Sequence, residues 1–271
     1  MTDRASAEPS TAALVLFGDW FAPHRPSFWL GELLGALDAV GINPRSARTV
    51  AQRFANAGWF DVERVGRRSR YTSTPTALDE LARGDLRILD PPQGRPADRW
   101  TLVSVDAADL DPAVEKRLRW LGLGELRRGL WLSPFVPDDA LDAVLGDRSH
   151  EVFVDAHVDG RNGDLVERCW DLAAAEDAYR TFLTRHDDGG RGPTDHREAF
   201  VQRFALNHDF LLAVRVDPQL PADLLPPGWP GTAARSLFER RRAELEEPAR
   251  CYLTGLADHH DDLARRSPAA V

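Results

Sequence analysis

The sequence predicts an α+β protein of three domains: a helical N-terminal domain that ends in a β-hairpin, a small central α/β domain and a mainly helical C-terminal domain. The 271 residues exceed what one compact core usually holds. Helix and strand patterns alternate only in the middle of the chain. The segment "ILDPPQGRPADRW" (88–100) concentrates proline and glycine, as linkers do. We therefore expect domains at residues 11–88, 99–160 and 165–265.

The N-terminal domain is predicted to contain three short helices and a hairpin. Ser27 and Asn43 are good N-cap residues, Pro44 suits the first helical position, and Gly41 suits a helix end. "WFDVERVGRRSRYTST" alternates around Gly66, as the two strands of a hairpin do. The expected elements are helices at Thr11–Trp20, Ser27–Gly41 and Asn43–Ala57, and strands at Trp59–Arg64 and Ser69–Thr74. This order is typical of a winged helix-turn-helix domain, with the hairpin as the wing.

The central and C-terminal domains are predicted from their hydrophobic periods. Strand and helix patterns alternate as βαβαβ in the central domain. From Arg168 onward apolar residues recur at helical spacing, interrupted by a loop at 186–196 and a proline-rich segment at 217–231. The expected central elements are strands at 100–106, 129–134 and 151–158 and helices at Pro112–Leu121 and Asp138–Leu145.

Basic side chains gather in one stretch of an acidic protein. The formal net charge is -9, yet seven arginines face only Asp61 and Glu63 between Gly41 and Arg70. On the third predicted helix, polar and basic residues lie opposite the apolar ones, and such side chains contact phosphates and base edges. An ordinary solvated face is the alternative. We predict that double-stranded DNA binds here, and the candidate contacts are Arg45, Arg48, Thr49, Gln52, Arg53, Arg67, Arg68 and Arg70.

Three motifs resemble those of one family in the order in which that family has them. "WLGELLGALDAVGINPRSARTVAQRFANAGWFDVERVGRRSRY" resembles the winged-helix segment of the PaaX-type transcriptional repressors. "RLRWLGLGELRRGLWLSP" is similar to their middle domain, and "CWDLAAAEDAYRTFL" with "DPQLPADLLPPGWPG" to their C-terminal domain. The resemblance covers the whole chain. It implies a homodimeric regulator that represses transcription at a partly palindromic operator.

The resemblance also implies release by a small-molecule effector, which in well-known members is phenylacetyl-coenzyme A, an aryl-acyl-CoA. It places the recognition-helix positions at Arg48 and Thr49 and the wing positions at Gly66, Arg67, Arg68 and Tyr71, of which Tyr71 is interpreted as structural. Where many members have arginines after a His-acid-aromatic run, this chain has "NHDFLLAVRVDP", so its effector can differ. Aromatic and polar residues of the C-terminal domain are the candidates for the effector pocket, with core packing as the alternative. These candidates are Trp170, Tyr179, His208 and Trp229.

A second interpretation comes from the central domain. It resembles the ferredoxin-like fold of the Cas2-like nucleases, in which an aspartate at the end of the first strand binds metal. Asp106 occupies that place, and the alternative is an acid that caps the next turn. The segment "ADHHDD" (257–262) is interpreted as a solvated tail, although it could bind a divalent metal. A ligand-binding protein without DNA function is a further possibility.

The remaining observations concern chemistry and compartment. The chain has no Ser-His-Asp arrangement, phosphate-binding glycine loop or Cys-His zinc signature, so we expect no enzyme, catalytic residue, cofactor or metal site. Its two cysteines need no disulfide framework, and its N-terminal apolar run is too short to span a bilayer. We expect a cytoplasmic protein without membrane contact.

Overall fold

The computed structural model describes residues 8–89, 99–135, 138–157, 162–187 and 192–265. These residues form two compact units. The first takes in the described residues of 1–89, 186–210 and 236–271, and the second takes in those of 90–185 and 211–235. The helices of the predicted C-terminal domain are therefore divided between the two units. Most of the predicted linker and part of the predicted loop at 186–196 lie outside the described residues.

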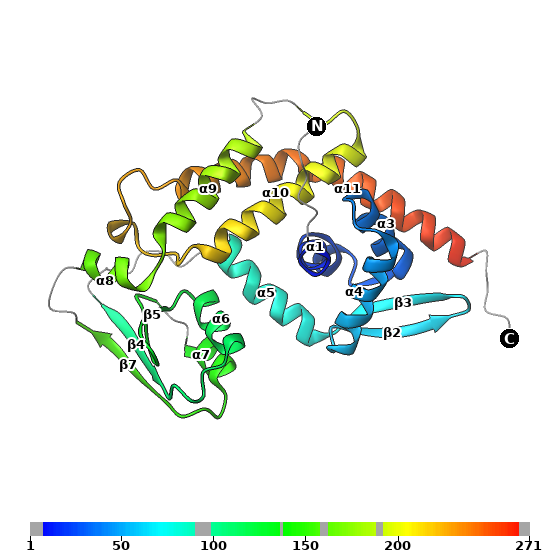
Figure 1. Cartoon of the computed structure of the whole chain (residues 1–271). Coiled ribbons are helices and arrows are strands. Elements are labelled where there is room, and N and C mark those ends of the chain that lie inside the picture. The colour runs from blue at the N-terminus through cyan, green and yellow to red at the C-terminus, as the bar shows by residue number, and fades with distance from the viewer. Residues whose placement is uncertain (1–7, 90–98, 136–137, 158–161, 188–191, 266–271) are drawn as a thin grey trace. The chain divides into compact units, whose positions relative to one another are not determined.

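The N-terminal part of the first unit follows the predicted order (Figure 1). Its third predicted helix and both predicted hairpin strands are confirmed, with each boundary within one residue. A fifth helix, for which no prediction was made, follows the hairpin. The elements are α1 (Pro9–Leu16), η1 (Phe17–Phe21), α2 (Ala22–His24), β1 (Ser27–Trp29), α3 (Leu30–Ala39), α4 (Pro44–Asn56), β2 (Phe60–Val65), β3 (Arg68–Ser73) and α5 (Pro75–Leu89).

The predicted start of the second helix is wrong. Ser27 does not cap it, because Ser27–Trp29 form the short strand β1, which pairs with β3 and sets Phe28 opposite Tyr71. Helix α3 begins only after Trp29, whose backbone N–H donates to the Glu32 carboxylate at 2.9 Å. Phe28 and Trp29 are almost completely buried. Burial of this aromatic pair in the sheet outweighs the local preference for a serine cap.

The first predicted helix is also interrupted. Regular α-helix ends at Leu16, and the chain continues through η1, a π-helical turn. Phe17 of this turn packs its ring against Phe28, Phe54 and Phe60, with centroid distances of 6.2, 5.3 and 4.8 Å. This aromatic cluster joins the helices to the antiparallel sheet of order β1-β3-β2. Aromatic pairs at these distances add to the free energy of burial, so the cluster fixes the hairpin on the helices.

The central part of the second unit contains one strand more than predicted. Its elements are β4 (Trp100–Val105), α6 (Pro112–Trp120), β5 (Gly124–Arg127), β6 (Leu130–Ser133), α7 (Asp138–Leu145) and β7 (His150–Ala156). The four strands form one antiparallel sheet of order β5-β6-β4-β7. The extra strand, β5, has only four residues, and two of them are charged, so its alternation was too short to detect.

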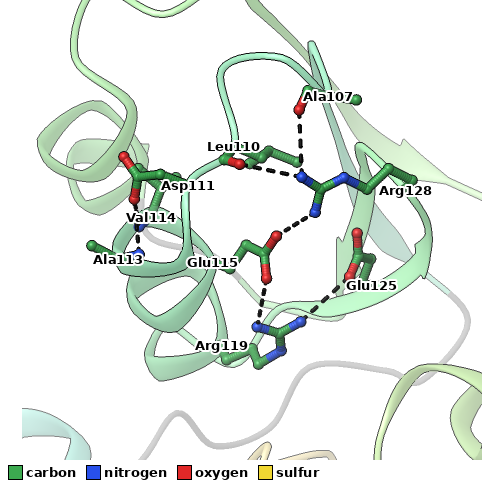
Figure 2. A network of polar contacts seen from close by, with 9 residues as sticks. All are labelled: Ala107, Leu110, Asp111, Ala113, Val114, Glu115, Arg119, Glu125 and Arg128. Atoms are coloured by element: carbon green, nitrogen blue, oxygen red, sulfur yellow. Dashed lines mark hydrogen bonds and ion pairs between the residues drawn. The ribbon is translucent and has the colours of Figure 1, made fainter.

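Arginine and glutamate side chains fasten the β5–β6 turn to α6 (Figure 2). Arg128 donates to the Glu115 carboxylate and to the backbone oxygens of Ala107 and Leu110. Arg119 bridges Glu115 and Glu125 at 3.3 Å each. These contacts explain how so short a strand keeps its place at the edge of the sheet.

The C-terminal half is helical, as predicted, and no strand occurs in its described residues. Its elements are α8 (Asn162–Cys169), α9 (Leu172–His186), α10 (His196–Val216), the short 3₁₀ turn η2 (Ala222–Leu224) and α11 (Gly231–Arg265). Helix α11 contains Pro248 and continues beyond it. Helices α10 and α11 each contribute residues to both units.

Candidate nucleic-acid interface

Helix α4 begins where the sequence predicts, for local reasons. The Asn43 side chain accepts a hydrogen bond from the backbone N–H of Ser46 at 2.9 Å, and Pro44 occupies the first helical position. Ala47, Val50 and Ala51 are buried against the preceding helices. Because these three residues fall on one side of the helix, the opposite side is directed to solvent.

The solvent side of α4 carries five of the predicted DNA contacts. Arg45, Arg48, Thr49, Gln52 and Arg53 are all exposed. Among the described residues, none of the three guanidinium groups has a hydrogen-bond or ion-pair partner. The Thr49 hydroxyl donates to the carbonyl of Arg45 at 3.1 Å, and the Gln52 amide donates to Asn56 at 2.9 Å. The structure therefore brings these five residues onto one accessible surface with unused donors.

The three predicted wing arginines do not share one environment. Arg67 is exposed in the two-residue turn of the hairpin, next to Gly66, whose φ of 59° suits glycine. Arg70 is also exposed, but its guanidinium lies over the Trp29 ring, 4.6 Å from the centroid. Arg68 donates to the backbone oxygen of His260 in α11 at 3.0 Å. Only Arg67 among the three has an uncommitted guanidinium within the described structure.

Two arginines of helix α10 form hydrogen bonds with elements of the N-terminal domain. These contacts were not predicted from the sequence. Arg197 donates to the Ala39 carbonyl at 3.3 Å, at the turn between α3 and α4. Arg203 makes two hydrogen bonds of 2.7 Å to Asp19 in η1, and Arg242 of α11 adds a third at 3.1 Å. The Arg203 side chain is 8% exposed and that of Asp19 is 15% exposed. This is a nearly buried, bidentate ion pair.

The interpretation of residues 257–262 as a solvated tail is wrong: Ala257 is buried, and His260 and Asp261 contact the N-terminal elements. Asp261 accepts from the Trp29 indole N–H at 2.8 Å and from Arg25 at 3.1 Å. The His260 ring lies against Gly31, and burial, with His259 and Arg68 nearby, lowers the pKa of this imidazole. The Arg25 guanidinium also pairs with the buried Glu32 carboxylate, which raises the pKa of Arg25. A contact between residues over 230 positions apart leaves no local signal in the sequence.

Comparison with known proteins identifies the family. The model of the PaaX-like protein family matches residues 9–76, and that of the PaaX-like protein C-terminal domain matches residues 170–255. The transcriptional repressor PaaX of Escherichia coli (strain K12) is 30% identical over 243 residues, which cover 82% of this chain and 75% of the repressor. The chain belongs to the PaaX-like family.

A solved structure is similar along most of the chain. The uncharacterized protein Rv0674 from Mycobacterium tuberculosis matches with a TM-score of 0.55 and 25% identity. The match covers 88% of this chain and 97% of that one. Together with the repressor, these similarities support a transcriptional regulator and give no support to the alternative of a nuclease.

The geometry of Asp106 agrees with a capping role in this PaaX-like chain. Its carboxylate accepts from the backbone N–H of Ala108 at 2.9 Å, and its carbonyl accepts from Asp109. Among the described residues, no group of three or more His, Cys, Asp or Glu side chains could hold a metal ion. None of the helices in this described part of the chain has the length and apolarity needed to cross a bilayer.

The four effector candidates do not form one site within a unit. Trp170, Tyr179 and Trp229 belong to the second unit, whereas His208 belongs to the first. Tyr179 is buried, donates to Asp217 at 2.5 Å and packs edge-on against Trp229. His208 stacks on Phe204 and contacts Asp209, which also contacts His186. Both arrangements are those of packed, satisfied side chains.

Trp170 differs because it lines a groove. The groove has a volume of about 1020 Å³ and lies between the end of α8, the start of α9 and the segment 223–226. Its apolar lining includes Trp170, Leu172 and Leu224, while its charged lining is mostly acidic. The indole nitrogen of Trp170 is buried without a partner within the described residues. The charged lining residues are Glu167, Arg168, Asp171, Glu176 and Asp223.

Proposed function

We propose that this PaaX-like protein is a transcriptional repressor that binds double-stranded DNA through a winged helix-turn-helix domain. The observation that carries the proposal is the solvent side of α4, which presents three guanidinium groups without partners in the described part of the chain. Arginine, glutamine and threonine are the side chains that contact phosphates and base edges in the major groove. We assign contacts with DNA bases or phosphates to Arg45, Arg48, Thr49, Gln52 and Arg53. We assign contacts with the DNA backbone to Arg67 and Arg70.

The order of the elements supports the finer fold assignments within this proposal. Helices α3 and α4 joined by a short turn, followed by the β2–β3 hairpin, agree with a helix-turn-helix and its wing. The β-α-β-β-α-β order of the central elements agrees with a ferredoxin-like domain. Since β7 is an edge strand with Val152, Phe153 and Val154 exposed, we assign the contact of a homodimer to this edge.

We also propose that a small molecule releases the repressor from DNA and that it binds in the groove beside Trp170. The apolar lining suits an aryl group, and the buried indole N–H can donate to a carbonyl oxygen. The acidic rim repels phosphates. An aryl-acyl-CoA would therefore place its aryl-acyl end in the groove and its phosphates outside it. This arrangement favours an effector whose recognised part is uncharged.

Selection of genomic DNA tests the DNA-binding function. Fragments of the genome that encodes the protein are incubated with the purified chain, and retained fragments are titrated in a band-shift assay. We expect Arg48→Ala to weaken binding by about 1–3 kcal/mol for a base contact. Arg83→Ala, on the exposed side of α5, is the control because it removes the same charge outside the α4 surface. Equal binding by wild type and Arg48→Ala would remove α4 from the interface.

A further inference from the structure

The C-terminal end of α11 contacts strand β1 and strand β3, and β3 is part of the β2–β3 hairpin. Trp29 on β1 lies opposite Arg70 on β3, so the Trp29, Arg68 and Arg70 side chains share one face of the sheet. On this face Arg68 donates to the His260 carbonyl at 3.0 Å, and the Trp29 indole donates to Asp261 at 2.8 Å. Two adjacent residues of α11 thus hold two neighbouring strands.

Asp261 also joins the sheet to the start of α3. Its second carboxylate oxygen accepts from Arg25 at 3.1 Å, and Arg25 forms a bidentate pair with Glu32 at 2.9 and 3.0 Å. The Glu32 carboxylate in turn accepts from the backbone N–H of Trp29, which caps α3. Its side chain is 3% exposed. The carboxylate of Asp261 is therefore the point where β1, α3 and α11 meet.

Glycines in α3 permit this close approach. A Cβ atom on Gly31 would lie 2.2 Å from the His260 ring, and one on Gly35 would lie 3.2 Å from Leu256. Gly31 and Gly35 are four residues apart, as are Leu256 and His260, so each pair lies on one side of its helix. The contact has a defined register, because the ring fits only where a side chain is missing.

Apolar packing alone does not explain this contact. The match to the PaaX-like C-terminal domain ends at residue 255, whereas His260 and Asp261 lie beyond it. Their polar bonds end on β1 and β3 rather than in the aromatic core. The buried charge of this network is that of Glu32, which is 3% exposed and pairs with Arg25, the residue that Asp261 also binds. A buried charge is retained at a cost in desolvation, so we take this network to be a place where the structure fixes geometry.

We propose that Asp261 and Arg68 are positioning residues, through which the end of α11 sets the position of the β2–β3 hairpin for DNA binding. The inference rests on the proposed DNA-binding function. Arg68 commits its guanidinium to a backbone carbonyl of α11 and makes no phosphate contact. Arg67, one residue earlier in the turn, is free to make one.

The first experiment compares Asp261→Ala with Asp262→Ala on a fragment retained by the wild-type protein. Both variants remove one negative charge from the same turn of α11, but Asp262 pairs only with exposed Arg265 among the described residues. Loss of an acid alone strengthens binding to DNA. We expect Asp261→Ala to weaken binding roughly tenfold, because hydrogen bonds to charged groups are lost, and Asp262→Ala to bind no more weakly than wild type. Equal affinities of the two variants would overturn the inference.

The second experiment separates positioning from direct contact by the salt dependence of binding. Loss of one phosphate contact lowers the slope of log affinity against log salt by about 0.9. We expect Arg68→Ala to weaken binding with the wild-type slope, and Arg67→Ala to lower the slope. A lowered slope for Arg68→Ala would make Arg68 a DNA contact and overturn the inference.

A third measurement needs no DNA and so distinguishes failure of this inference from failure of the proposed function. Amide hydrogen exchange in β2 and β3 is compared for Asp261→Ala and Asp262→Ala in the full chain. The inference requires faster exchange only in Asp261→Ala. If the wild type retains no genomic fragment but this difference is present, the proposed function fails while the contact stands. If exchange in the two variants is equal, the inference fails whatever the DNA result.

Discussion

The Asp19–Arg203 pair makes a strong test of how the C-terminal helices stabilise the N-terminal domain. Asp19→Asn removes the charge that faces Arg203, whose side chain is 8% exposed, and leaves at most one of the two 2.7 Å acceptors. Breaking a buried pair from one side costs about 3–5 kcal/mol when the remaining charge stays buried without compensation. After the change Arg203 keeps an ion pair with Glu246, which is 3.6 Å away and half exposed. Arg203 also donates to the Arg242 carbonyl at 2.6 Å, which keeps it in place. We expect a loss near the lower end, about 3 kcal/mol.

Hydrogen exchange of the slowest amides in α3 and α4 measures this loss, because it reports the first unit without requiring the whole chain to unfold in one step. Glu80→Gln is the control. Glu80 and its partner Arg83 are both about half exposed, so the Glu80→Gln substitution should lower stability by less than about 1 kcal/mol. The double variant Asp19→Asn with Arg203→Met removes both charges and should cost less than the sum of the single variants. The reasoning is refuted if Asp19→Asn costs no more than the control, or if the two single effects add.

Two further predictions concern the contact between α3 and α11. Gly31→Ala places a methyl group within 2.2 Å of the His260 ring, so exchange at the end of α11 should accelerate; the control Gly255→Ala, with nothing within 4 Å, should stabilise α11 by roughly 0.5–1 kcal/mol. If the amides at the end of α11 exchange as slowly in Gly31→Ala as in wild type, the close packing is contradicted. The second prediction concerns pH. The pKa of His260 lies below its ordinary 6.5, chiefly through burial, with His259 and Arg68 lowering it and Glu32 and Asp261 raising it. Above pH 6.5 the stability of the contact should not change with pH. As the pH falls below 6.5, the unpacked imidazole takes up a proton more readily than the packed one, so the contact loses stability. The loss ends once the pH has passed the lowered pKa of packed His260. Exchange of the β2–β3 amides, corrected for intrinsic rates, should therefore accelerate below pH 6.5 in wild type, and His260→Gln should abolish that dependence.

The sequence predicted those features of the fold that depend on near neighbours. Asn43, Pro44 and the apolar positions of α4 lie within one helix, so the cap and the exposed face could be derived from spacing alone. Gly66 marked the hairpin turn for the same reason. Strand β1 was missed because its conformation depends on pairing with Tyr71, over forty positions later, and not on Ser27.

The site was predictable only in part. Arginines concentrated in an acidic chain marked α4 and the hairpin tip, because charge can be counted without knowledge of the fold. The same count gave no way to separate Arg67 from Arg68, since their difference comes from the long-range contact of Arg68 on β3 with His260 in α11. Asp261 was similarly assigned to a solvated tail, because its partners Trp29 and Arg25 are more than 230 residues away.

These long-range contacts make the N-terminal domain dependent on the helices that follow it. Helices α10 and α11 contact it at several places, among them Arg197 at the α3–α4 turn, Arg203 at η1 and Asp261 at β1. Each place adjoins an element that, in the proposed function, sets how α4 or the hairpin meets DNA. Consider a ligand that favours the state in which one of these contacts is broken. Such a ligand lowers the affinity of the protein for DNA, and by linkage DNA lowers the affinity of the protein for the ligand by the same factor. Release from DNA therefore needs no displacement of the arginines on α4. A ligand that discriminates about a hundredfold between the two states would supply about 2.7 kcal/mol, comparable to one or two of the hydrogen bonds to charged groups that hold these elements.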